Sequence, residues 1–321
     1  MNFSKLFDIP RGHEHLAFVD VDFDRDTRLF IDPTLIEYDP SPIGRECHAL
    51  ITSYFREVFD CIRREDWEML WQLSMFAREP NETALGLSRN VPSGRGASPE
   101  ILMRIYQDIK EQGLLDNGLI HNPADIVLYT ENFGADRMSD LLTNVIRRGL
   151  HRFTIEQCFM HSYALSQESV FLGAFWSPEA GCWGNASAPT LVVHGKKRLL
   201  VPKQFVSKRS VKDTSEMFMR IIIPYLQEEH LAADTSLVRH GVDRKGRSWT
   251  KPPIKADVRK DELRYGSTKN RVCAYLNRDF RAAEEYDEFT CHKLENDGGL
   301  LSDWELDRIT YGVGWQLAED A

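Results

Sequence analysis

The sequence predicts a mixed α/β (α+β) fold, in which a central mixed sheet is flanked by long amphipathic helices and followed by a C-terminal appendage. Apolar residues recur at spacings of three and four in long stretches such as 45–77, which is typical of amphipathic helices. Short apolar runs such as 126–129 are typical of buried strands. With 42% hydrophobic and 28% charged residues, the 321-residue chain can build a sizeable core. We expect a main α/β domain over residues 1–233 and a basic, then acidic C-terminal domain or appendage over residues 234–321.

The N-terminal part of the chain is predicted to contain two strands and two helices. Residues 16–23 and 28–33 are the strands, and the aspartates within 20–26 are expected on a solvated face because they alternate with other residue types. The periodic stretch 45–77 is the first helical stretch, with a charged break at residues 63–66. The second helix begins at Pro99, because proline is favoured at the first helical position.

The centre of the chain is predicted as a strand, an acidic turn and a long helix. Ile126–Tyr129 is the strand, and one amphipathic helix runs from Ser139 past Cys158. Further strands are predicted over residues 169–176, 190–193 and 198–202, and further helices over residues 214–231 (kinked at Pro224), 261–279 and 302–316.

The charge of the chain is unevenly distributed. The net charge is −9, yet residues 194–213 carry seven lysines and arginines against one acid, and residues 239–271 carry eleven against four. Two basic blocks in an acidic chain favour contact with DNA or RNA. No apolar run approaches the ~20 residues that span a bilayer, and the N-terminus lacks the apolar core of a signal peptide. We therefore expect a cytoplasmic protein without a membrane partner.

A glycine-containing loop before Pro99 is a candidate phosphate site. Gly94 and Gly96 let backbone N–H groups approach an anion, and Arg89 and Arg95 can add bidentate contacts near a helix N-terminus. The loop matches neither of the standard glycine-rich nucleotide motifs. The alternative interpretation is a surface loop that leads into a well-capped helix.

The acidic turn after Tyr129 is a candidate catalytic centre. Metal-dependent phosphodiester cleavage needs carboxylates to hold Mg²⁺ and a lysine to offset charge. Glu131, Asp136 and Asp140 could hold the metal, while Asp136, Asp140 and Lys203 would carry catalysis in a nuclease of the PD-(D/E)xK kind. The spacing does not match that motif, and the alternative is that these acids cap a helix and favour its first turn. The catalytic interpretation depends on contact between Lys203 and the acidic turn.

A binding subunit without catalysis is the second hypothesis. Its phosphate contacts would come from the basic block Lys196–Lys212 together with residues 239–271, and its stacking surfaces from Trp249, Tyr265 and Tyr275. The candidate phosphate ligands of this block are Lys196, Lys197, Arg198, Lys208 and Arg209.

Several short motifs resemble a group of uncharacterised bacterial proteins associated with mobile elements and phage-defence loci. The motifs are Leu29–Pro33, Glu79–Glu82, Gly86–Ser88, Gly94–Gly96, Gly134–Asp140 and Leu199–Lys203. The resemblance covers roughly residues 8–230 and assigns no catalytic residue. It implies a bacterial antiphage defence protein that acts on nucleic acid, either as a nuclease or as a sensor subunit working with a partner effector protein.

Overall fold

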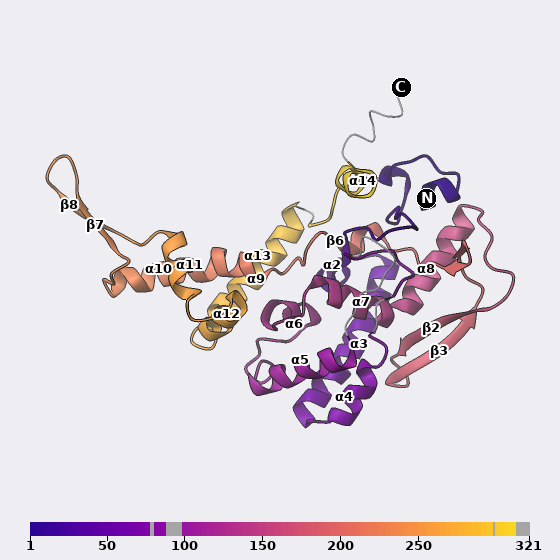
Figure 1. Ribbon diagram of the computed structural model, residues 1–321, viewed down its shortest axis with the longest axis horizontal. Coiled ribbons are helices and arrows are strands. Elements are labelled where there is room, and N and C mark those ends of the chain that lie inside the picture. The colour runs from indigo at the N-terminus through magenta and orange to yellow at the C-terminus, as the bar shows by residue number, and fades with distance from the viewer. Residues whose placement is uncertain (78–79, 88–97, 298, 313–321) are drawn as a thin grey trace, which may run out of the picture.

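The protein has a mixed α+β fold in which helices predominate, as Figure 1 shows. The computed structural model describes residues 1–77, 80–87, 98–297 and 299–312. The predicted fold class is confirmed. In the described part of the chain, no helix is long and apolar enough to cross a membrane.

The helices of the N-terminal part include those of the predicted periodic stretch. They are α1 (Phe3–Leu6), η1 (His13–His15), α2 (Pro33–Tyr38), α3 (Pro42–Arg64), α4 (Trp67–Ser74) and α5 (Pro99–Glu111). The helical pattern predicted over 45–77 is confirmed, and it is interrupted at the predicted charged break, where Glu65 adopts a left-handed conformation that ends α3. Asp66 then caps α4 by accepting a hydrogen bond from the backbone N–H of Met69. The start of α5 at Pro99 is confirmed.

The predicted strand at the centre of the chain is a helix. Residues Pro123–Tyr129 form α6, which begins with a capping box between Asn122 and Asp125. The strand prediction failed because the apolar run that ends α6 is buried on all sides, and such a run has no period that separates a strand from a helix. The long helix predicted next is also two helices, α7 (Ala135–Val145) and α8 (Arg147–Met160), which break at Ile146.

The strands form separate antiparallel pairs in place of the predicted central sheet. The pairs are β1 (Phe30–Ile31) with β6 (Val206–Ser207), β2 (Val170–Ser177) with β3 (Cys182–Ala188), β4 (Val192–Val193) with β5 (Lys196–Lys197), and β7 (Arg239–Val242) with β8 (Ser248–Lys251). The predicted strands 16–23 and 198–202 pair through a single isolated β-bridge, between Phe18 and Pro202. Both segments are extended and apolar, but a short contact of this kind does not make a ladder.

The C-terminal third is helical apart from the ribbon of β7 and β8. Its elements are α9 (Thr214–Met217), η3 (Phe218–Ile222), α10 (Ile223–Ala232), α11 (Lys255–Glu262), α12 (Thr268–Leu276), α13 (Arg281–Asp297) and α14 (Asp303–Tyr311), with η2 (Lys203–Phe205) preceding them. The helical path predicted over 214–231 is confirmed. Its middle, η3, is a π-turn beside Pro224, which lacks the N–H that a regular α-helix would use.

One large contiguous core runs through the described chain, and a small separate cluster lies at Leu35, Val211 and Leu294. The largest buried side chains of the large core include Trp176 of β2 and Tyr54 of α3, whose rings meet edge to face. The indole of Trp176 donates to Ser53, and that of Trp183 donates to the carbonyl of Leu73, so β2 and β3 are fixed to α3 and α4. The ribbon of β7 and β8 projects from the opposite end of the molecule in Figure 1. The domain boundary near residue 233 stays a prediction.

Candidate functional site: a cationic pocket and a basic ribbon

The candidate site is a pocket of about 820 Å³ between β2, β5 and the junction of α7 and α8. Five parts of the chain line it: residues 23–26, residues 75–76 with 80–82 and 84, the α7–α8 junction, Ala174 of β2, and residues 196–198. A pocket of this volume is in the range that holds a small ligand. Because the contributing segments are far apart in sequence, only the folded chain creates it.

An ion-pair cluster lies at the heart of the pocket. The Glu82 carboxylate is 2.9 Å from Arg147 Nη1 and 3.0 Å from Lys197 Nζ. The Arg147 guanidinium also donates to Asn144 Oδ1 at 2.6 Å and to the carbonyl of Leu172 at 3.0 Å. Burial alone would raise the pKa of Glu82, but the nearby cations hold that pKa below its ordinary value. The pocket therefore contains a fixed, ionised network.

Arg198 adds a second buried guanidinium to the wall. It donates to the carbonyl of Asn81 at 3.2 Å and to that of Phe23 at 3.0 Å. Its guanidinium carbon also lies 5.4 Å from the centre of the Phe23 ring. Its hydrogen-bond acceptors are neutral carbonyls, and its charge is attracted to the carboxylates of Asp24, Glu82 and Asp26. Lys196 is exposed at the same edge.

The predicted phosphate ligands are divided between two pockets. Lys196, Lys197 and Arg198 line the 820 Å³ pocket. Lys208 and Arg209 line a second pocket of about 480 Å³, together with the predicted metal ligand Glu131. The predicted loop residues Arg89, Gly94, Arg95 and Gly96 lie outside the residues that the structure describes.

The predicted metal ligands lie around the start of α7. Glu131 hydrogen-bonds to Ser267 Oγ, Asp136 is half-buried in the first turn of α7, and Asp140 is buried one turn further on. Burial raises the pKa of Asp136, against the opposing effect of Arg137. Over the residues that the structure covers, no three His, Cys, Asp or Glu side chains are grouped so that they could hold a metal ion.

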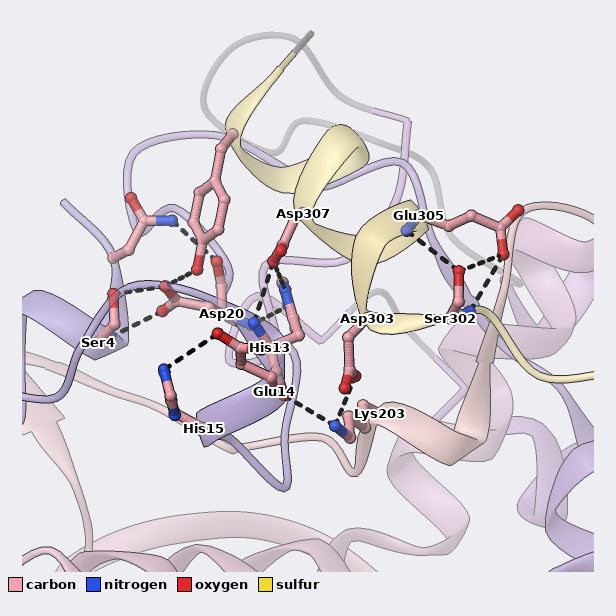
Figure 2. A network of polar contacts seen from close by, with 12 residues as sticks. Ser4, His13, Glu14, His15, Asp20, Lys203, Ser302, Asp303, Glu305 and Asp307 are labelled. Carbon is pink, nitrogen blue, oxygen red and sulfur yellow. Dashed lines mark hydrogen bonds and ion pairs between the residues drawn. The ribbon is translucent and has the colours of Figure 1, made fainter. Parts of the chain in front are cut away.

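Lys203 has two partners, and neither belongs to the acidic turn. Its ammonium donates to the carbonyl of His13 at 2.8 Å and to Asp303 Oδ1 at 2.6 Å, as Figure 2 shows. Asp307 of the same C-terminal helix accepts from the backbone N–H and the ring Nδ1 of His13. Lys203 thus helps to fasten α14 to the N-terminal segment.

Sequence reasoning missed Glu82, Asn144 and Arg147 as site residues. The only signal was indirect: Asn144 and Arg147 lie opposite the apolar side of the helix predicted from Ser139 past Cys158. In the structure both are buried. Polar residues on such a side are usually exposed, and only the tertiary contact with Glu82 identifies this case as a site.

The ribbon of β7 and β8 carries a separate cluster of basic residues. Its register pairs Arg239 with Lys251 and Gly241 with Trp249. The Trp249 ring lies on Gly241, where a Cβ atom would come within 2.3 Å of it, and Lys251 Nζ lies 5.1 Å from the ring centre. Arg239, Trp249 and Lys251 therefore share one face. Three further cations, Arg244, Lys245 and Arg247, occupy the turn.

The fold and the site together define a mixed α+β protein with a buried cationic pocket and a projecting basic ribbon. The chain belongs to the family described as a domain of unknown function, DUF8370, whose model matches residues 8–213. No curated protein and no solved structure matches the chain.

Proposed function

We propose that this protein binds double-stranded DNA through the ribbon of β7 and β8, and that it serves as a recognition subunit in bacterial antiphage defence. The observation that carries the proposal is a narrow two-stranded ribbon with basic side chains on one face and at its tip. The major groove of B-form DNA, about 12 Å wide, admits such a ribbon. The major groove of an RNA duplex is too narrow for side chains to read.

The charge of the ribbon suits a polyanion. Residues 239–251 contain five lysines and arginines against one acid, Asp243, in a chain whose net charge is −9. Asp243 is occupied within the turn, where it accepts from the backbone N–H groups of Lys245 and Arg247 at 2.8 and 2.9 Å. These bonds lower the pKa of Asp243. Its carboxylate therefore stays ionised and keeps the turn in this conformation. Arg244 and Lys245 remain exposed on it.

The shape of the ribbon also suits insertion. In Figure 1 it extends from α10 and α11 away from the rest of the chain. The packing of Trp249 on Gly241 stiffens the pair, and Gly246 supplies the left-handed conformation that the turn requires. A stiff, basic, isolated ribbon can approach a duplex without a clash from the body.

Binding is favoured over cleavage by the partners of Lys203. A Mg²⁺-dependent nuclease built on Glu131, Asp136 and Asp140 needs a lysine beside them, and the Lys203 ammonium is bonded to His13 and Asp303 instead. The proposal therefore assigns any cleavage step to a partner effector protein.

The test is fluorescence anisotropy with a labelled DNA duplex, the matching single strand and an RNA duplex. The charge-reversed variant Arg244→Glu/Lys245→Glu should bind duplex DNA at least tenfold more weakly and lower the salt slope by about 2, as expected for two lost phosphate contacts (roughly 0.9 per contact). The matched control is Arg259→Glu/Lys260→Glu on exposed positions of α11. Equal losses in both variants would show a non-specific charge effect.

The same samples test the nuclease alternative. Incubation of wild type with duplex DNA and Mg²⁺ should leave the DNA intact. Cleavage that disappears in both Asp140→Ala and Lys203→Ala would restore the catalytic interpretation and contradict the assignment to a partner.

A further inference from the structure

We infer that the 820 Å³ pocket binds a nucleoside monophosphate, a ligand that joins a phosphate monoester to a flat ring. The pocket is lined by five cationic side chains and three carboxylates, which leaves two positive charges in excess. The cations are Arg25, Arg147, Lys196, Lys197 and Arg198, and the carboxylates are Asp24, Asp26 and Glu82. A phosphate monoester carries about −1.5 to −2 at pH 7, so it matches this excess.

The buried cations are held ready for an anion. Glu82 orients both Arg147 and Lys197, and Lys197 also donates to the carbonyl of Leu172 at 2.9 Å. Arg147 and Arg198 are each 6% exposed. Because their positions are fixed before the ligand arrives, binding costs little side-chain entropy. Planar guanidinium groups also match the geometry of phosphate oxygens.

An apolar wall completes the pocket. Phe23, Met75 and Phe76 line it, and Met75 and Phe76 are each 42% exposed, so that their apolar surface is open to a ligand. The Phe76 ring lies 5.6 Å from the ring of Trp183, and this contact steadies it. An exposed, steadied aromatic ring beside cations is the arrangement on which a nucleobase stacks.

The combination of cations with an apolar wall argues against two simpler ligands, inorganic phosphate and a nucleoside without phosphate. Inorganic phosphate would use the cations and leave Phe76 and Met75 exposed to water. A nucleoside without phosphate would use the apolar wall and leave the excess charge unmatched. Only a ligand with both features uses both walls of the pocket.

The experiment is isothermal titration of the full chain with AMP, GMP, CMP and UMP, and with adenosine and inorganic phosphate for comparison. At least one nucleotide should bind, and its affinity should exceed those of adenosine and of phosphate by tenfold or more, since a charge-assisted contact contributes about that factor. If none of the four nucleotides binds up to millimolar concentration, or if adenosine binds as tightly as AMP, the inference fails.

Two surface variants locate the site without disturbing the buried network. Phe76→Ala should weaken nucleotide binding about tenfold and leave phosphate binding unchanged, because it removes only a stacking surface. Lys196→Glu should weaken both, because it removes the positive excess. The matched controls are Trp71→Ala, an exposed aromatic outside the pocket, and Lys5→Glu, an exposed lysine outside it. Controls that weaken binding as much as the pocket variants would place the nucleotide elsewhere.

This inference is independent of DNA binding. The ribbon variant Arg244→Glu/Lys245→Glu should keep its affinity for the nucleotide, and Phe76→Ala should keep its affinity for the DNA duplex. A loss of both activities in either variant, with an unchanged melting temperature, would contradict two separate sites.

Discussion

Replacing Asp307 by alanine should release helix α14 from the N-terminal segment. Asp307 is 6% exposed and its Oδ1 atom accepts two hydrogen bonds from His13, one from the backbone N–H at 3.0 Å and one from ring Nδ1 at 2.6 Å. Figure 2 shows this contact at the centre of the network that joins the two ends of the described chain. Without the carboxylate, both donors of His13 lose their partner inside the protein.

The size of the effect follows from the two bonds. A hydrogen bond to a charged group contributes about 1.5–3 kcal/mol, so the loss of two amounts to roughly 3–6 kcal/mol. The nearby pair of Asp303 with Lys203 gives the contrast. Their side chains are 40% and 27% exposed, and an exposed ion pair contributes only about 0–1 kcal/mol. Asp303→Ala on the same helix is therefore the matched control.

Native-state hydrogen exchange measures the free energy of this local opening. In Asp307→Ala, amides of η1 and α14 should exchange faster by a factor that corresponds to about 3–6 kcal/mol, while amides of α3 should be unchanged. The reasoning is refuted if α14 keeps the protection it has in wild type, or if Asp303→Ala lowers that protection equally.

Three further perturbations test other buried charges. In urea titrations, the free energy of unfolding of wild type should decrease as the pH falls below about 6.5. Burial lowers the pKa of His13 in the folded chain, so at lower pH only the unfolded chain binds a proton there. His13→Gln should show a flatter pH dependence. Lys212→Met should cost about 3–5 kcal/mol in the same titration, because it leaves the carboxylate of Asp125, 1% exposed, without its cation. Glu82→Leu should cost a similar 3–5 kcal/mol by leaving the buried Arg147 without its carboxylate, and a change below about 1 kcal/mol would show that the pocket network is not fixed.

Helix boundaries with local chemical signals could be predicted from the sequence. Proline at the first position of α5 and the apolar period of α3 depend only on neighbouring residues, and both predictions were confirmed. The strand predicted at Ile126–Tyr129 failed for the opposite reason. A short apolar run that is buried on every side indicates burial but does not distinguish a strand from a helix. The capping box between Asn122 and Asp125 favours the helix.

Burial of polar residues could not be predicted from the sequence. The aspartates within 20–26 alternate with other residues, and a solvated face was predicted for them. In the structure Asp20 is fully buried, where it accepts from the backbone N–H and hydroxyl of Ser4 and from the hydroxyl of Tyr311. The donors lie 16 and 291 residues away in sequence. No local sequence pattern predicts the burial of Asp20. Alternation indicates on which face of a strand a side chain lies, but it does not indicate which other part of the chain covers that face.

The same distinction separates the two proposed sites. The ribbon is made of residues adjacent in sequence, so its basic composition was visible before the structure, and it lies outside the range 8–213 that the family model matches. The pocket is made by tertiary contact of segments between residues 23 and 198, all within that range. A family model describes positions that recur among its members, so the pocket is the candidate for the activity the family shares. The ribbon is then the candidate for the proposed binding of DNA. If so, nucleotide binding should be found in other members of the family, and DNA binding only in those that carry such a ribbon.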